Sequence, residues 1–190
     1  MSRRPNPELE EKILAAARKL WKQGGASALT MRAVAKVAKT NTPAVYRRFR
    51  DREDILRALL QRIRLEFVAV LGAAPSPEDA CERYIDYALS HPHEYELFYQ
   101  HEYELFYSAR AVRAGAKNVS RPGRDTMRRK LAEKFGGLPD DYVRLTTSLW
   151  MVAHGAAMLM IGRTIPPQEV EESRAIFTAS VAALLGKPNL

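Results

Sequence analysis

The sequence predicts an all-α protein, and two observations support this fold class. Apolar residues recur at spacings of three and four along most of the 190 residues, which is the period of an amphipathic helix. Pairs of Gly or Pro, which end or begin helices, separate these periodic segments at Gly24-Gly25, Gly136-Gly137 and Pro166-Pro167. We therefore expect a succession of helices joined by turns.

The first helix is expected over residues 7–23 and should cover a three-helix core. Six of its apolar residues share one face: Leu9, Ile13, Ala16, Ala17, Leu20 and Trp21. Thr30 is a good N-cap, and the apolar spacing after it predicts a short second helix from Met31 to Val37.

A third helix should follow Asn41, a strong N-cap, with Pro43 in its first turn, where a missing N–H is tolerated. At about 100° per residue, Val45 and Phe49 fall on one face and can pack inward. The other side should then carry residue types that read DNA grooves: Thr42, Pro43, Ala44, Tyr46 and Arg47. This stretch has the outline of a helix-turn-helix.

Four motifs follow one another here: Thr30-Met31-Arg32-Ala33-Val34-Ala35, Ala38-Lys39-Thr40-Asn41, Val45-Tyr46-Arg47-Arg48-Phe49 and Arg52-Glu53-Asp54-Ile55-Leu56. Their succession resembles the pattern of the TetR/AcrR family of transcriptional regulators. Lys39 stands where the family usually has a turn Gly, so either backbone strain or a slightly different turn is expected there. Arg52 replaces the usual Lys and keeps its charge.

The resemblance implies that double-stranded DNA is a partner and that two sets of residues contact it. One set contacts phosphates: Thr30, Arg32, Tyr46 and Arg52. The other set approaches base edges: Thr42, Ala44 and Arg47. Arg47 is the best candidate for binding a guanine.

The distribution of charge independently indicates a polyanionic partner. Residues 1–64 contain 16 Lys or Arg and 6 Asp or Glu, whereas residues 65–190 contain 14 and 16. The net charge of +8 therefore belongs to the part of the chain that carries the helix-turn-helix motif, which favours DNA binding.

Asp51 is expected to cap a long fourth helix that links two domains. We assign residues 1–52 to a helix-turn-helix DNA-binding domain and residues 53–190 to a helical domain for ligand binding and dimerisation. The linking helix should cover about residues 52–71, before the Gly, Ala and Pro of residues 72–77. A further helix is expected from Pro77 to Ser90.

A tandem repeat follows, in which residues 93–100 and 101–108 agree at seven of eight positions. Either the helix is longer by eight residues, or one copy is accommodated in a bulge or loop. The repeat places tyrosines at a spacing of four, and such a stripe often belongs to a core. It also falls where regulators of this family keep a ligand pocket, so the pocket candidates are Tyr84, Tyr95, Phe98, Tyr99, Tyr103, Phe106, Trp150 and His154.

Basic residues dominate from Ser108 to Lys130, and we interpret them as a solvated helical face. Two long helices are expected after Pro139 and after Pro166-Pro167. The first is apolar over more than one face, so it needs a partner outside its own subunit. The pair is similar to a four-helix dimer interface, with candidate residues Leu149, Val152, Ala156, Met160, Phe177, Val181 and Leu184.

Several functions have no support in the sequence. It has no Gly-rich phosphate loop after a strand, no nucleophile elbow and no Cys/His set at zinc spacing, so we predict no enzyme, no cofactor and no metal site. Cys81 is the one cysteine, which excludes an internal disulfide. No apolar run approaches the roughly 20 residues of a membrane span, and the charged start is unlike a signal peptide, so a cytoplasmic protein is expected.

These observations predict a homodimeric regulator, a repressor, that binds a palindromic operator and responds to a small-molecule effector of unknown identity. The segment from Trp150 to Gly155 also resembles the W-x-x-x-H-G motif of one ligand-binding branch of the family. The alternative is a helical interaction protein with a vestigial helix-turn-helix that binds no specific DNA sequence.

Overall fold

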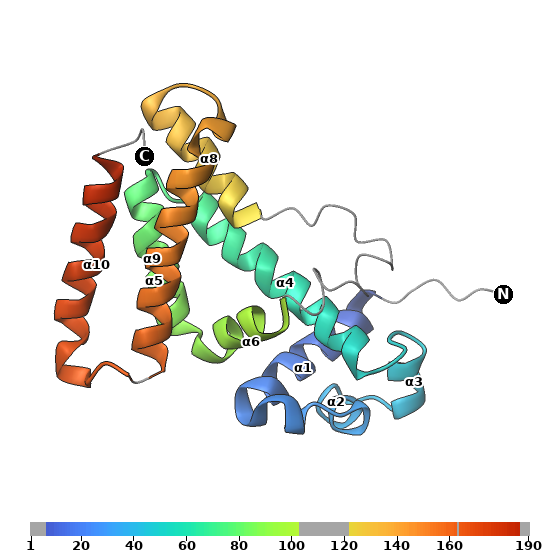
Figure 1. The fold of residues 1–190 in the computed structure, drawn as a ribbon. Coiled ribbons are helices and arrows are strands. Elements are labelled where there is room, and N and C mark those ends of the chain that lie inside the picture. The colour runs from blue at the N-terminus through green and yellow to red at the C-terminus, as the bar shows by residue number, and fades with distance from the viewer. Residues whose placement is uncertain (1–6, 103–121, 163, 187–190) are drawn as a thin grey trace.

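The computed structural model describes residues 7–102, 122–162 and 164–186, and every regular element within these ranges is helical (Figure 1). The all-α prediction is confirmed. None of the described helices is long and apolar enough to cross a membrane. The described residues also contain no group of three His, Cys, Asp or Glu placed to hold a metal ion.

The first three helices form the lower body in Figure 1: α1 (Pro7–Ala28), α2 (Met31–Val37) and α3 (Thr42–Tyr46). Both predicted caps are present, because Ala33 N–H donates to Thr30 Oγ1 at 3.1 Å and Ala44 N–H donates to Asn41 Oδ1 at 2.8 Å. The helical dihedral angles of α1 break at Gly24-Gly25, as expected, before one more turn.

The turn between α2 and α3 places Lys39 at a φ of 54°, in the left-handed region. The sequence predicted either backbone strain or a slightly different turn here. The structure shows the first, a left-handed backbone that Gly would adopt with less strain. Helix α3 is shorter than expected, since it ends at Tyr46 and Arg47 is its C-cap. Asn41 caps its start, and Phe49, which follows the helix, is buried in the core of α1–α3.

Helix α4 (Arg52–Gly72) extends from the lower body to the upper one (Figure 1). Its N-terminal half buries Leu59 and Ile63 in the core of α1–α3, and its C-terminal half buries Phe67 and Leu71 in a second core. Asp51 Oδ1 accepts from Asp54 N–H at 2.8 Å and caps α4 as predicted.

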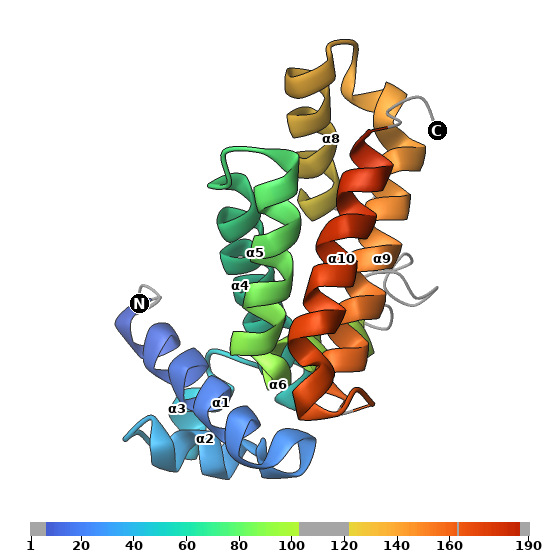
Figure 2. The same ribbon diagram turned by 90° about the vertical axis from the view of Figure 1, so that its left-hand side faces the viewer.

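The second core is built by α5 (Pro77–Ser90), α8 (Pro122–Phe135), α9 (Val143–Ile161) and α10 (Val170–Leu185). Short 3-10 turns, η2 (Pro139–Tyr142) and η3 (Pro167–Glu169), precede the last two helices. Helices α9 and α10 lie side by side on the outside of this body (Figure 2).

Helix α6 (Pro92–Glu102) lies between the two cores. Its Leu97 and Phe98 join the core of α1–α3, and its Tyr95 joins the second core. The helix contains the whole first copy of the repeat and enters the second copy. The remainder of that copy, including the pocket candidates Tyr103 and Phe106, lies outside the described residues.

Four predicted dimer residues are buried inside the subunit: Leu149, Met160, Phe177 and Val181. In the isolated subunit they fill the second core, where α9 packs against α5 and α10, and this leaves them little surface for a partner subunit. The large apolar side chains that α9 and α10 leave exposed are different ones: Val143, Met151, Met158, Leu159 and Ile176. Val152, Ala156 and Leu184 are half-buried.

Candidate DNA-binding surface and effector cavity

The helix-turn-helix leaves most of the predicted DNA-contacting side chains accessible. Thr30, Arg32, Arg47 and Arg52 are exposed, Tyr46 is 54% exposed, and Thr42 is half-buried. Arg47 and Arg48 differ, because Arg48 forms an ion pair with Glu10 of α1. Within the described residues, no such pair holds Arg47, so its guanidinium is available to an external partner.

Ala44 is an exception, since it is only 5% exposed. The expectation that it lies on the outer side of α3 is wrong. Adjacent helical residues differ by about 100°, and the buried arc of α3 is wide enough to include both Ala44 and Val45. We therefore leave Ala44 out of the base-reading set.

An ion-pair cluster ties α1 to the beginning of α6. Glu94 is 1% exposed and accepts from Arg18 Nε at 2.6 Å and Nη2 at 3.0 Å, while Lys22 Nζ lies 2.9 Å away. Burial alone would raise the pKa of Glu94, but the hydrogen bonds from Arg18 and Lys22 hold it below its usual value. Trp21 Nε1–H also donates to the His93 carbonyl at 3.1 Å. Any displacement of α6 must therefore disturb α1 or break this cluster.

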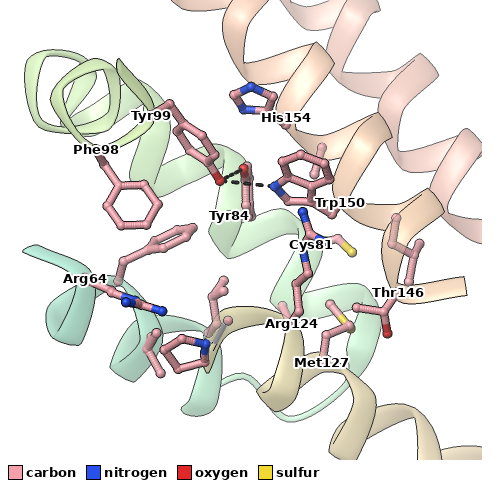
Figure 3. A pocket seen from close by; sticks show the side chains of 18 residues that line it. Arg64, Cys81, Tyr84, Phe98, Tyr99, Arg124, Met127, Thr146, Trp150 and His154 are labelled. Atoms are coloured by element: carbon pink, nitrogen blue, oxygen red, sulfur yellow. Dashed lines mark hydrogen bonds between the residues drawn. The ribbon is translucent and has the colours of Figure 1, made fainter. Parts of the chain in front are cut away.

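The second body contains a cavity of about 400 Å³ among helices α4, α5, α6, α8 and α9 (Figure 3). This volume lies within the range of about 300–1,000 Å³ that is typical of small-molecule sites. Its walls are mainly apolar and aromatic, with Phe98 on one side and Trp150 on another (Figure 3), and the Phe67 ring lies 6.4 Å from that of Phe98.

Tyr hydroxyls and a histidine form a hydrogen-bonded chain along the cavity wall. Tyr84 Oη lies 2.5 Å from Tyr99 Oη and 2.8 Å from Tyr95 Oη, and Tyr95 Oη lies 2.7 Å from His154 Nδ1. Trp150 Nε1–H donates to Tyr99 Oη at 3.3 Å. Burial raises the pKa of Tyr84 and Tyr95 and lowers the pKa of His154, so all three side chains are neutral at pH 7.

Two family models match the chain and together cover most of it. The model of bacterial regulatory proteins of the tetR family matches residues 13–59, and the model of the tetracyclin repressor-like C-terminal domain matches residues 78–184. The chain belongs to the TetR family. The match does not distinguish branches within the family, so the branch suggested by the Trp150–Gly155 motif stays a prediction.

Solved structures share this TetR fold over nearly their whole length. A TetR transcriptional regulator from Streptomyces coelicolor has 18% identity and a TM-score of 0.68, with 95% of this chain and 97% of that chain covered. A TetR variant from Acinetobacter baumannii AYE, in complex with minocycline, has 19% identity and a TM-score of 0.60, with 92% of each chain covered. A protein of unknown function from Rhodococcus sp. RHA1 has 23% identity and a TM-score of 0.72, with 93% of each chain covered. A comparison with curated proteins gave no match.

Five predicted pocket residues of this TetR-family protein line the cavity: Tyr84, Phe98, Tyr99, Trp150 and His154. Tyr95 is not among the lining residues and supports the wall from behind through its hydrogen bonds to Tyr84 and His154. Cys81, which also lines the cavity, is 2% exposed, and burial together with Glu78 and Glu82 raises its pKa to about 12. This thiol is therefore un-ionised at pH 7.

Three polar residues of the cavity were not predicted: Arg64, Arg124 and Thr146. Arg124 was assigned to a solvated face, and this is wrong, because its Cζ lies 4.0 Å from the centroid of the Trp150 ring. Arg64 could have been noticed, since it follows the buried Leu60 by four residues and precedes Phe67 by three, which places it on the inward face of α4.

Proposed function

We propose that this TetR-family regulator is a repressor that binds a palindromic operator as a homodimer and leaves it when a small molecule fills the cavity. The observation that carries the proposal is the combination, in one chain, of an exposed helix-turn-helix, an effector-sized cavity and a helix, α6, that contacts both. Because the proposed partner is operator DNA, we place the action of the protein in the cytoplasm.

The proposed dimer uses the exposed apolar side chains of α9 and α10 in place of the buried residues named from the sequence. A two-fold axis through these helices would give two recognition helices, which read half-sites about 34 Å apart. We retain residues 1–52 as the proposed DNA-binding unit and residues 53–190 as the proposed effector and dimer unit.

We infer a route from cavity to DNA through α6. Tyr99 and Phe98 line the cavity, and one turn earlier Glu94 binds Arg18 of α1. An effector that displaces Tyr99 would move α6 and, through Glu94, change how α1–α3 sit relative to the dimer axis. A ligand shifts this equilibrium only by its difference in affinity for the two arrangements.

The experiment is selection of DNA sequences by the purified protein, followed by binding measurements with two variants. Arg47→Ala should cost about 1–3 kcal/mol of operator binding and relax the preference at one base pair, whereas Arg52→Ala should weaken all sequences alike and flatten the salt dependence by about one unit. Recovery of no preferred sequence would instead favour an interaction protein with a vestigial helix-turn-helix. Equal losses on operator and random DNA for both variants would refute the assigned roles.

A further inference from the structure

One hydroxyl group in the cavity lining, that of Thr146, is buried without a hydrogen-bond partner. Among the described residues, three side chains carry such a buried oxygen: Glu78, Tyr87 and Thr146. Thr146 is the one of these three that lines the cavity, and it is 3% exposed. A buried hydroxyl without a partner is costly, so this position is suited to a polar atom of a ligand.

Other hydroxyl groups of α9 and α10 are bonded to their own helix. Thr147 Oγ1–H, one residue after Thr146, donates to the carbonyl four residues earlier at 2.8 Å, and Thr178 and Ser180 make the same bond at 3.1 and 2.8 Å. This is the usual bond of a Thr or Ser inside a helix. Thr146 does not make it, so its hydroxyl proton remains available to a ligand acceptor.

The aromatic part of the lining uses its polar atoms within the wall. Tyr84 Oη is hydrogen-bonded to both Tyr95 Oη and Tyr99 Oη, and Trp150 Nε1–H donates to Tyr99 Oη. His154 Nδ1 is bonded to Tyr95 Oη. These bonds hold the rings in place, and this part of the wall therefore presents mainly ring surface to the cavity.

The two arginines of the lining do not provide a site for an anion. Arg64 and Arg124 each already interact with another group of the protein, so we count neither guanidinium as available to a ligand. A carboxylate would lose its hydration on entering the cavity, and a single hydroxyl does not offset that cost. The group that meets Thr146 should therefore be uncharged.

The rest of the cavity is suited to a flat apolar body. The ring centroids of Phe67 and Phe98 lie 6.4 Å apart, and those of Phe98 and Tyr99 lie 5.0 Å apart, which are favourable separations for aromatic rings. Figure 3 shows Phe98 and Tyr99 on one side of the cavity and Thr146 and Met127 on the other. A ligand that spans the cavity thus meets rings at one end and the free hydroxyl at the other.

We propose that the effector is an uncharged aromatic compound whose carbonyl oxygen accepts a hydrogen bond from Thr146 Oγ1–H while its rings pack against Phe67, Phe98 and Tyr99. A carbonyl oxygen fits better than a ligand hydroxyl, because it accepts the free proton and brings no proton of its own that would require a further acceptor. This inference rests on the proposed function, since it names the chemical class of the effector of the same cavity.

The test compares three probes with one bicyclic skeleton: the ketone 1-tetralone, the hydrocarbon tetralin and the anion tetralin-1-carboxylate. Calorimetric titration of the full-length protein at pH 7, without DNA, should show that the ketone binds at least as tightly as the hydrocarbon, because Thr146 replaces the water that the carbonyl loses. The carboxylate should bind weakest. Tightest binding of the carboxylate, or no binding of 1-tetralone at millimolar concentration, would overturn the proposal.

Variants locate the ketone preference at Thr146. Thr146→Val should weaken 1-tetralone binding about tenfold and change tetralin binding by less than about twofold, because only the ketone is left with an unsatisfied oxygen. Thr146→Ser keeps the hydroxyl and should keep the preference. Thr147→Val is the matched control, since it removes a hydroxyl of the same helix that lies outside the cavity lining. An equal loss for both probes in Thr146→Val, or the same loss of the ketone in Thr147→Val, would contradict the proposed contact.

The unliganded protein gives a readout that depends on no probe. Thr146→Val should raise the thermal midpoint, because it removes a buried hydroxyl that has no partner and keeps the shape of the side chain. A lower midpoint would show that the hydroxyl is already satisfied, and the proposal would fail. Because none of these measurements contains DNA, they are independent of operator selection. Failure of selection with an intact ketone preference would remove the repressor function alone, and the opposite result would remove the effector class alone.

Discussion

Lys39 adopts a left-handed backbone conformation that Gly would adopt at a lower cost in free energy. Its φ of 54° lies in the left-handed region, where a side chain with a Cβ costs roughly 1–2 kcal/mol. Lys39→Gly should therefore raise the free energy of unfolding by about 0.5–1 kcal/mol, since part of the gain is lost to the greater entropy of Gly in the unfolded chain. Urea denaturation measures the change.

Lys36 provides the matched control, because it is an exposed lysine of the regular helix α2. Lys36→Gly should lower the free energy of unfolding by about 1 kcal/mol. If both glycine variants lose the same stability, the left-handed conformation of Lys39 carries no strain and the prediction is wrong.

Residue-scale features could be predicted wherever they depend on near neighbours. Thr30, Asn41 and Asp51 cap helices in the structure as the sequence indicated, because a cap bonds to an amide two or three residues away. Arg124 could not be assigned in this way. A helical arginine usually faces solvent, and only the approach of α9 places Trp150 beneath it.

At the scale of elements, α6 packs against both bodies, and Glu94 is its main bond to α1. Glu94→Gln removes the charge but keeps the shape, so it should lower the free energy of unfolding by about 1.5–3 kcal/mol, as expected for charge-assisted hydrogen bonds. The effect of an effector on operator affinity should shrink, while effector binding to the cavity without DNA is unchanged. Operator titrations with and without effector measure this coupling.

The pH dependence provides a second measurement of the same contact. The folded-state pKa of Glu94 is lowered from 4.5, so its charge stabilises the fold fully above about pH 4.5 and this contribution is lost as the pH falls through the lowered pKa. The difference in the free energy of unfolding between the wild type and Glu94→Gln should therefore shrink as the pH falls through this range. Glu96→Gln, on the same helix, is the control, and an equal loss of coupling in that variant would refute the role of Glu94.

The sequence predicted where most helices begin and end, including Pro77–Ser90 and Met31–Val37, because caps, Gly and Pro are local signals. It left open how α6 accommodates the repeat. Two copies that agree at seven of eight positions offer nearly the same local preferences, and contacts distant in sequence, such as Glu94 to Arg18, hold the first copy between the two cores.

At the scale of the whole molecule, the sequence predicted that the last two helices carry more apolar surface than one subunit can cover, but not which residues face outward. When a helix has apolar residues on several faces, the sequence does not show which face points outward. The structure shows it. Leu149 and Val181 face inward, whereas Met151 and Met158, seven residues apart on one side of α9, remain exposed together with Ile176.

Ile176→Asp should therefore separate the proposed dimer without unfolding the subunit. The side chain is 60% exposed in the isolated chain, so a carboxylate there remains hydrated in the monomer, but burying it unpaired between subunits would cost several kcal/mol. Light scattering after size exclusion should show a mass near 21.5 kDa for the variant and twice that for the wild type, with little change in thermal midpoint. Operator affinity should fall although α1–α3 are unchanged.

Two further substitutions separate an interface effect from a core effect. Leu65→Asp introduces the same charge at an exposed apolar residue of α4, away from α9 and α10, and should remain dimeric. Leu149→Asp places the charge at a residue that is 1% exposed, and should destabilise the second body, because a carboxylate among apolar core side chains is costly. A dimeric Ile176→Asp protein, or a wild type that is monomeric at micromolar concentration, would show that the exposed apolar face of α9 and α10 is not where two subunits meet.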